Sequence, residues 1–296
     1  MQAWLIIAYG LLIVAGVALL VFAFRTGDRR YLYLAVLLFV VFPVVIVLKF
    51  PTEISPETQL LYDAVEKLPD SSNVLLTFDY YASTLAETEP MSRATLRHLF
   101  RKDCRVLTMT TIPLGGPSIA ERVTREIAAE MGKVYGVDYV NLGYKANYVA
   151  VLKGMGSSIE AIYPTDNSGT PLAKLPMMSR IKNYADISFI IAIADNDIVS
   201  YWISIVRAQY GTPVGTGVTA VSAPQYYAYV GAGQLTGMLG GMKGAAEYEA
   251  LVGHPDRATK GMTAQSLVHL FIIFSVVAGN VIFLIQKRRA GAGGQA

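Results

Sequence analysis

Three long apolar segments stand out in the pattern of hydrophobic and polar positions, two near the beginning of the chain and one near its end. Residues 3–24, 31–48 and 267–285 contain no charged side chain and are 22, 18 and 19 residues long. A helix needs about 20 residues to cross the hydrocarbon core of a bilayer. The pattern predicts three transmembrane helices: a hairpin within 1–50 and a single helix within 266–296, with a separate domain at 51–265 between them.

The charges around these segments predict how the chain is oriented. Three arginines and one aspartate separate the first two segments, and a Lys-Arg-Arg run follows the third, which gives these two parts a net charge of +5. Residues 51–265 contain 21 acidic and 18 basic side chains. Lysine and arginine are enriched in cytoplasmic loops. We therefore expect a multi-pass protein of the cell (plasma) membrane, with a cytoplasmic C-terminus and an extracytoplasmic domain that is periplasmic or extracellular.

Two other interpretations are weaker than this one: a nucleic-acid-binding protein, suggested by the basic charge, and a cleaved signal peptide in place of the first membrane helix. The sequence pI is near 8.8, but the basic excess comes from residues that flank the membrane, so nucleic acid is not an expected partner. A cleaved signal peptide is the alternative for residues 3–24. This segment lacks a basic start, and its apolar run exceeds the usual length of roughly 7 to 15 residues.

Short apolar runs alternate with helical patterns in the middle domain. The predicted strands are 73–79, 104–111, 137–142, 148–152, 187–194 and 214–222, and the predicted helices are 91–100, 119–132 and 198–210. Residues 187–194 are apolar at almost every position, as in a strand that is covered on both faces. The alternation predicts an α/β fold with a mainly parallel sheet between helices, of Rossmann-like or flavodoxin-like type.

Ligands of such sheets bind beyond the carboxyl ends of the strands. The candidate ligand-binding residues at this rim are Asp79, Thr111, Gly115, Gly116, Ser118, Lys145, Asp195 and Asp197. The Gly-Gly-Pro-Ser segment at 115–118 could present backbone N–H groups to an anion, or it could be an ordinary tight turn. Ser118 and Glu121 have the spacing of a capping box.

The three aspartates of this rim have two interpretations. Asp79, Asp195 and Asp197 could hold Mg²⁺ or Ca²⁺, or act as acid and base. Aspartates at strand ends also cap helices and form turns. The second interpretation is favoured, and no metal site is predicted.

Catalytic motifs are absent from the sequence. It contains no Gly-x-Gly-x-x-Gly or Walker loop, no Gly-x-Ser-x-Gly elbow and no local histidine or cysteine pair with metal-ligand spacing. We predict no catalytic residue and no cofactor, and the question of enzymatic activity stays open, with the balance against it. The single cysteine, Cys104, is expected to be buried in a strand.

Small residues recur every four positions in the segment 226–246, whose only charged side chain is Lys243. In a helix, Gly233, Gly237, Gly241 and Ala245 would form a continuous groove that allows close backbone contact. The contact is either internal, against the sheet of the same chain or its membrane helices, or an interface between protomers.

These features favour a membrane-anchored, non-catalytic subunit or scaffold of a membrane protein assembly. Its expected partners are the lipid bilayer and either further copies of the chain or other membrane subunits. The alternative is an extracytoplasmic binding or sensing module for a small anionic molecule.

Overall fold

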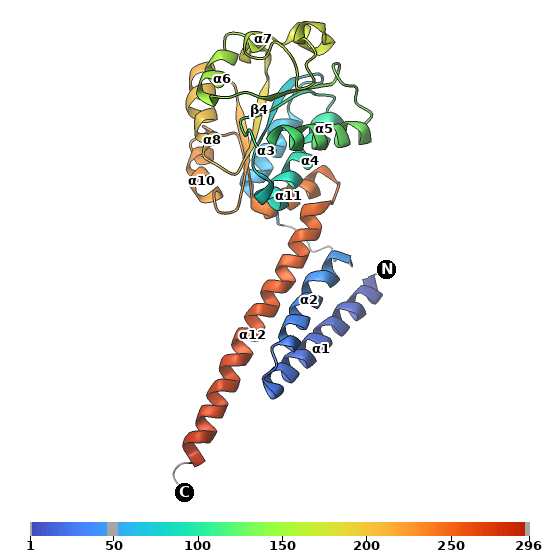
Figure 1. The fold of residues 1–296 in the computed structure, drawn as a ribbon, viewed down its shortest axis with the longest axis vertical. Coiled ribbons are helices and arrows are strands. Elements are labelled where there is room, and N and C mark those ends of the chain that lie inside the picture. Colours follow the sequence, from blue (N-terminus) through green and yellow to red (C-terminus); the bar gives the residue numbers. More distant parts are fainter. Residues whose placement is uncertain (1, 46–52, 294–296) are drawn as a thin grey trace. The chain divides into compact units, whose positions relative to one another are not determined.

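The computed structural model describes residues 2–45 and 53–293. It divides into two compact units, Met1–Pro51 with Thr259–Ala296, and Thr52–Ala258 (Figure 1). The first unit contains the apolar helices, and the second contains a parallel β-sheet with helices around it. Each unit is described by itself.

Helices α1 (Gln2–Thr26) and α2 (Arg30–Val45) form a hairpin in the first unit, together with most of α12 (Arg257–Gly293). Gly27 makes the turn at φ 73°, and the Asp28 carboxylate accepts a hydrogen bond from the Arg30 N–H. The two helices approach closely at Gly16, where a Cβ would overlap the Phe39 ring. Phe39 in turn stacks on Phe271 of α12, with 4.4 Å between the ring centroids.

Two of these helices are long and apolar enough to cross a membrane, over Ile7–Thr26 and Arg257–Leu284. Most side chains in both segments are exposed, as lipid-facing side chains would be. The apolar part of α2, Arg30–Phe42, is shorter. The predicted span at 31–48 ends outside the described residues, so the third crossing stays a prediction.

The second unit is built on one six-stranded sheet. Its strands are β1 (Asn73–Asp79), β2 (Arg105–Thr110), β3 (Tyr139–Tyr144), β4 (Phe189–Ala194), β5 (Val214–Val218) and β6 (Met238–Gly240). They lie in the order β3-β2-β1-β4-β5-β6, and every pair is parallel. This is the strand order of a Rossmann-like sheet, and the order reverses between β1 and β4.

Helices cover both faces of this sheet (Figure 1). On one face lie α3 (Pro56–Glu66), α4 (Leu85–Arg101), α5 (Gly116–Glu130) and α11 (Gly241–Val252). The other face carries α6 (Tyr148–Met155), a helix made of α8 (Ile198–Tyr201), a π-helical turn (Trp202–Arg207) and α9 (Ala208–Tyr210), and α10 (Ala223–Gly231). A short helix, α7 (Ile159–Ile162), and four 3₁₀ turns, at 82–84, 172–174, 176–180 and 184–186, complete the unit.

The central strands are buried on both faces, as the unbroken apolar run at 187–194 predicted. Every residue of β4 is buried, and so is every residue of β1 after Asn73. Cys104 is also buried, just before β2. The mixed α/β class and the parallel sheet are therefore confirmed.

Two predicted elements are wrong. Residues 148–152 form part of helix α6 rather than a strand, because Asn147 caps the helix by accepting a hydrogen bond from the Ala150 N–H. The segment 226–246 is not one helix: it contains the end of α10, the unpredicted strand β6 and the start of α11. Gly233 and Gly241 have φ values of 68° and 61°, which interrupt a right-handed helix.

The capping box at the start of α5 is also wrong. The helix begins at Gly116, and its N-cap is Gly115, which has a left-handed backbone conformation with φ 84°. Ser118 therefore lies inside the helix, where its hydroxyl donates a hydrogen bond to the Gly115 carbonyl. A Cβ on Gly116 would overlap the Thr110 side chain, so the turn needs glycine at both positions.

Candidate functional site

Asp79 ends β1 at the centre of the strand-end rim, and its side chain is fully buried. One carboxylate oxygen accepts hydrogen bonds from the Thr111 N–H at 2.6 Å and the Thr111 hydroxyl at 2.9 Å. The other accepts from the Thr77 hydroxyl at 2.6 Å and from the Trp202 indole N–H at 3.4 Å. Burial raises the pKa of Asp79, against the effect of these donors. The carboxylate joins β1 to β2 and to the helix after β4.

Asp195, at the end of β4, bonds to the loop after β1. Its carboxylate accepts hydrogen bonds from the Tyr81 N–H at 2.8 Å and from the Thr84 hydroxyl at 2.7 Å. In dinucleotide-binding sheets the phosphates bind at the turn after the first strand, on the N-terminus of the following helix. Here a carboxylate of the protein itself occupies donors at that turn.

A hollow of ≈ 240 Å³ lies at the same edge, where the strand order reverses. It is lined by Tyr81, Thr111, Ile112, Pro113, Tyr148, Asn196, Asp197 and Ile198. Two predicted rim residues, Thr111 and Asp197, are therefore brought together in this hollow. The lining contains a carboxylate and no lysine or arginine.

The other predicted rim residues do not line it. Gly115, Gly116 and Ser118 form the turn into α5. Lys145 lies at a second hollow of ≈ 260 Å³ beside Tyr144 and Tyr163. Its ammonium group donates a hydrogen bond to the Ile162 carbonyl at 2.5 Å and lies 5.9 Å from the centre of the Tyr163 ring. The lysine and the glycine turn are thus not combined in one hollow.

The four small residues of the predicted groove have separate surroundings. A Cβ on Gly237 would overlap the backbone of Leu61 in α3, and one on Gly241 would crowd Ala220. Ala245 is fully buried in α11, and no atom lies within 4 Å of a Cβ built on Gly233. The helical stripe that motivated the interface is not formed, and the close approaches at Gly237 and Gly241 are to parts of the same unit.

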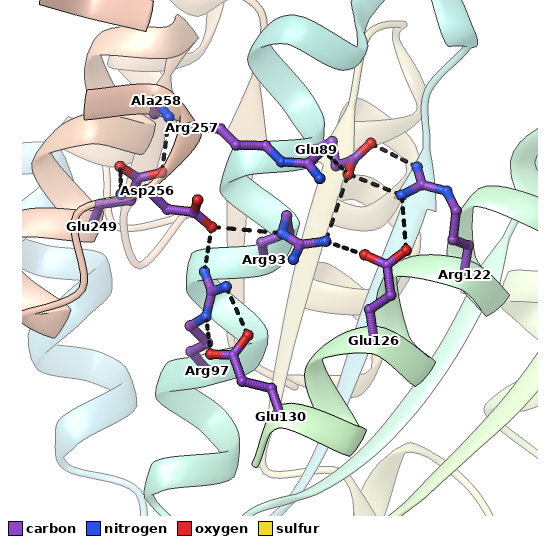
Figure 2. Close-up of polar contacts among 10 residues, drawn as sticks. All are labelled: Glu89, Arg93, Arg97, Arg122, Glu126, Glu130, Glu249, Asp256, Arg257 and Ala258. Carbon is purple, nitrogen blue, oxygen red and sulfur yellow. Dashed lines mark hydrogen bonds and ion pairs between the residues drawn. The ribbon is translucent and has the colours of Figure 1, made fainter. Parts of the chain in front are cut away.

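A ladder of ion pairs connects α4 to α5 (Figure 2). Each rung joins residues 33 positions apart, with shortest distances of 2.7 Å, 2.6 Å and 2.7 Å. The rungs are Glu89–Arg122, Arg93–Glu126 and Arg97–Glu130. The α4 members of all three are almost fully buried. Hydrogen bonds from Arg93 and Arg97 lower the pKa values of Glu126 and Glu130, respectively.

The ladder continues into the last residues of the second unit. Asp256 accepts a 2.8 Å hydrogen bond from Arg97 and lies 3.7 Å from Arg93, while Arg257 contacts Glu89 at 2.6 Å. Burial raises the pKa of Asp256, but the hydrogen bond from Arg97 and the nearby positive charges outweigh this effect and lower it. The carboxylates of Glu89, Glu126, Glu130 and Asp256 thus balance four guanidinium groups (Figure 2).

Two glutamates of α11 fix both ends of the second unit. Glu249 is buried and accepts hydrogen bonds from the Asp256 N–H at 2.8 Å and the Ala258 N–H at 2.9 Å, at the first turn of α12. Glu247 is also buried, and it accepts from the Ser55 N–H at 3.1 Å and the Ser55 hydroxyl at 2.5 Å, just before α3. A helix N-terminus has unsatisfied N–H groups that favour a carboxylate.

A buried histidine lies on the same side of the sheet. His98 bonds to the Tyr248 hydroxyl at 2.7 Å and to the Glu66 carboxylate at 3.0 Å, and its ring stacks on Tyr62. Burial and the charge of Arg101 lower the pKa of His98 to about 4, against the effect of Glu66. The imidazole is therefore neutral at neutral pH.

The charged ladder was not predicted, although the sequence contains a signal for it. Acidic and basic residues recur every four positions in both helices, at 89, 93 and 97 and again at 122, 126 and 130. The helical pattern of 91–100 places Arg93 and Arg97 away from the apolar residues Met91, Leu96, Leu99 and Phe100. The structure also buries the two arginines, because α4 is covered by α5 on one side and by α11 on the other.

Comparison with known proteins gives no relative. No family model, no curated protein and no solved structure matches the chain. Among the described residues, no group of three or more histidine, cysteine, aspartate or glutamate side chains is arranged to hold a metal ion.

Proposed function

We propose that this chain is a membrane-anchored, non-catalytic subunit or scaffold of a membrane protein assembly, and that its α/β domain is an interaction domain. The observation that carries the proposal is how the domain uses its charged groups. The four carboxylates of the ladder pair with arginines, and the Asp79 carboxylate is saturated by four donors. Groups bonded in this way are not available as acids, bases or nucleophiles.

The two ends of the domain support the same proposal. Glu247 and Glu249 belong to one helix, and they bond to Ser55 and to Asp256 and Ala258, the residues nearest to the two connections with the apolar unit. Carboxylates with several hydrogen bonds hold a backbone segment in one conformation. A domain whose first and last segments are each held in one conformation suits a subunit that presents a constant surface to its partners.

The size of the extracted protein tests this proposal. We expect extraction in a gentle detergent to give a particle whose protein mass, measured by native mass spectrometry, exceeds the 32.1 kDa of one chain. The particle contains either additional copies or other membrane subunits. A protein mass of one chain under every mild extraction condition would contradict the proposal.

The orientation of the chain is the second part of the proposal. The net charge of +5 on the two short basic parts favours a cytoplasmic position for them, so the domain at 51–265 is extracytoplasmic. Cysteines introduced at Gln2 and Gln295 can be labelled in intact cells, or in spheroplasts, with a reagent that does not cross membranes. We expect labelling at position 2 and protection at position 295. The reverse pattern would invert the orientation.

A further inference from the structure

The hollow between the ends of β1 and β4 combines two aromatic rings, one exposed and one half-buried, with one unpaired carboxylate. Tyr81 lines it from the loop after β1, Tyr148 from the first position of α6, and Asp197 from the loop after β4. The Asp197 side chain is exposed and has no hydrogen bond or ion pair with any other described residue. The remaining lining is apolar or uncharged.

Electrostatics at this edge favour a positive ligand. Asp195 and Asp79 follow the same two strands, and their carboxylates are bonded to hydroxyl and N–H groups rather than to cations. A hydrogen bond with Tyr201 and, to a smaller extent, the charge of Asp197 raise the pKa of Tyr148. The Asp197 charge is therefore felt at the phenol ring that lines the hollow. An anion placed here would meet carboxylates without a compensating lysine or arginine.

The size of the hollow and the aromatic rings that line it narrow the class of ligand further. The volume of ≈ 240 Å³ is below the roughly 300 to 1,000 Å³ of most ligand pockets, so only a small molecule fits. Carboxylates close to the open rim attract cations at long range, whereas aromatic faces attract them at contact. The Tyr148 ring is held in place by an edge-to-face contact with Tyr201, with 4.9 Å between the centroids.

We propose that this hollow binds a small organic ammonium ion, whose charged nitrogen contacts Asp197 and the faces of Tyr81 and Tyr148. Such a site differs from the anion site predicted for the same rim from the sequence. It does not depend on the scaffold role, since a subunit of an assembly can bind a small molecule.

Choline and its uncharged isostere 3,3-dimethylbutan-1-ol provide the sharpest probes, because they share a shape and differ in charge. Isothermal titration of the full chain in detergent should detect choline and not the alcohol or inorganic phosphate. Asp197→Asn should weaken choline binding by about three- to tenfold. Glu160→Gln, which removes an exposed carboxylate in α7, is the matched control and should leave binding unchanged.

The aromatic contribution has its own test at Tyr81. Tyr81→Phe keeps the ring and should bind choline like the natural protein, whereas Tyr81→Leu should bind about two- to fivefold more weakly. Circular dichroism of each variant without ligand checks that the fold is unchanged. The proposal would be overturned if the alcohol bound as tightly as choline, or if Asp197→Asn bound choline like the natural protein. It would also be overturned if phosphate bound more tightly than choline, or if choline at about 10 mM gave no heat of binding.

Discussion

Two groups of acidic side chains in the second unit differ in what surrounds them. In the ladder on α4 and α5, each carboxylate has an arginine within 2.8 Å. At the strand-end rim, Asp79 and Asp195 accept hydrogen bonds from hydroxyl, indole and backbone N–H groups, and Asp197 is exposed. Charge in the first group is neutralised by arginines, whereas the second group has no arginine or lysine partner and one of its members, Asp197, is exposed. The same residue types thus stabilise one region and prepare the other for a ligand.

The largest expected effect is the loss of a central arginine from the ladder. Arg97→Met leaves Glu130 and Asp256 without their closest partner. Because both carboxylates are partly exposed, we expect the free energy of unfolding to fall by about 2 to 3 kcal/mol. Denaturant titration of the detergent-extracted chain, followed through tryptophan fluorescence, measures it. Arg125→Met changes an exposed arginine on α5 and should stay within about 0.5 kcal/mol of the natural protein. A loss below about 1 kcal/mol for Arg97→Met would mean that the ladder contributes no more to stability than exposed ion pairs do.

The buried histidine gives an intermediate effect that depends on pH. His98 has a pKa of about 4 in the folded protein and about 6.5 in an unfolded chain. The unfolded state therefore binds the proton first, and stability is lost as the pH falls below 6.5. For His98 alone we expect a loss of about 2 kcal/mol between pH 8 and pH 5.

His98→Gln isolates this contribution, because the ladder carboxylates also become protonated in acid. Subtracting the profile of the variant from that of the natural protein should leave a decrease confined to the interval between about pH 6.5 and pH 4. Parallel profiles of the two proteins would show that His98 does not titrate differently on folding.

A smaller effect is expected at the rim. Asp195→Asn keeps an acceptor for Tyr81 and Thr84 but removes the charge from both hydrogen bonds, so we expect a loss of about 1 kcal/mol. Asp197→Asn, two residues later, should change stability by less than about 0.5 kcal/mol because the side chain is exposed. Thermal unfolding of both variants checks the difference. Equal losses would mean that the two rim aspartates are not distinguished by their partners.

The smallest effect concerns Ser118, whose predicted capping role the structure does not support. Ser118→Ala removes only an exposed hydrogen bond to the Gly115 carbonyl. The free energy of unfolding, followed through the thermal midpoint of the variant, should change by less than about 0.5 kcal/mol. Loss of a true N-cap costs about 0.5 to 2 kcal/mol. A decrease in stability near the upper value would indicate that Ser118 caps the helix after all.

Except for β6, the strands of the sheet could be predicted because their residues carry a local signal. Residues 73–79 and 187–194 are short, apolar and bounded by polar positions, and both form central strands. Residues 148–152 have the same composition, but Asn147 and the apolar residues up to Met155 make a helix more favourable. An apolar run of about five residues does not distinguish a helix from a strand. A helix buried on one face and a strand buried on both faces each favour apolar side chains.

The site was harder to predict because it depends on contacts between distant segments. The order of the strands places Tyr81 beside Asp195, 114 positions later, and no short motif contains both. The sequence correctly indicated that acidic residues follow β1 and β4. It did not indicate that Asp195 would occupy the backbone donors of the neighbouring turn, or that Lys145 would bond to Ile162. Those outcomes depend on how the loops fold over the sheet.

The bond between Ser55 and Glu247 has a consequence for the order in which the chain can fold during synthesis. The two residues are 192 positions apart, so the ribosome releases the first long before it makes the second. Until α11 emerges, the start of α3 lacks the carboxylate that accepts hydrogen bonds from Ser55. Contacts of such large separation form late and slow the folding of a domain. The newly made domain therefore completes its fold only when its last helix leaves the ribosome, immediately before the final apolar helix follows.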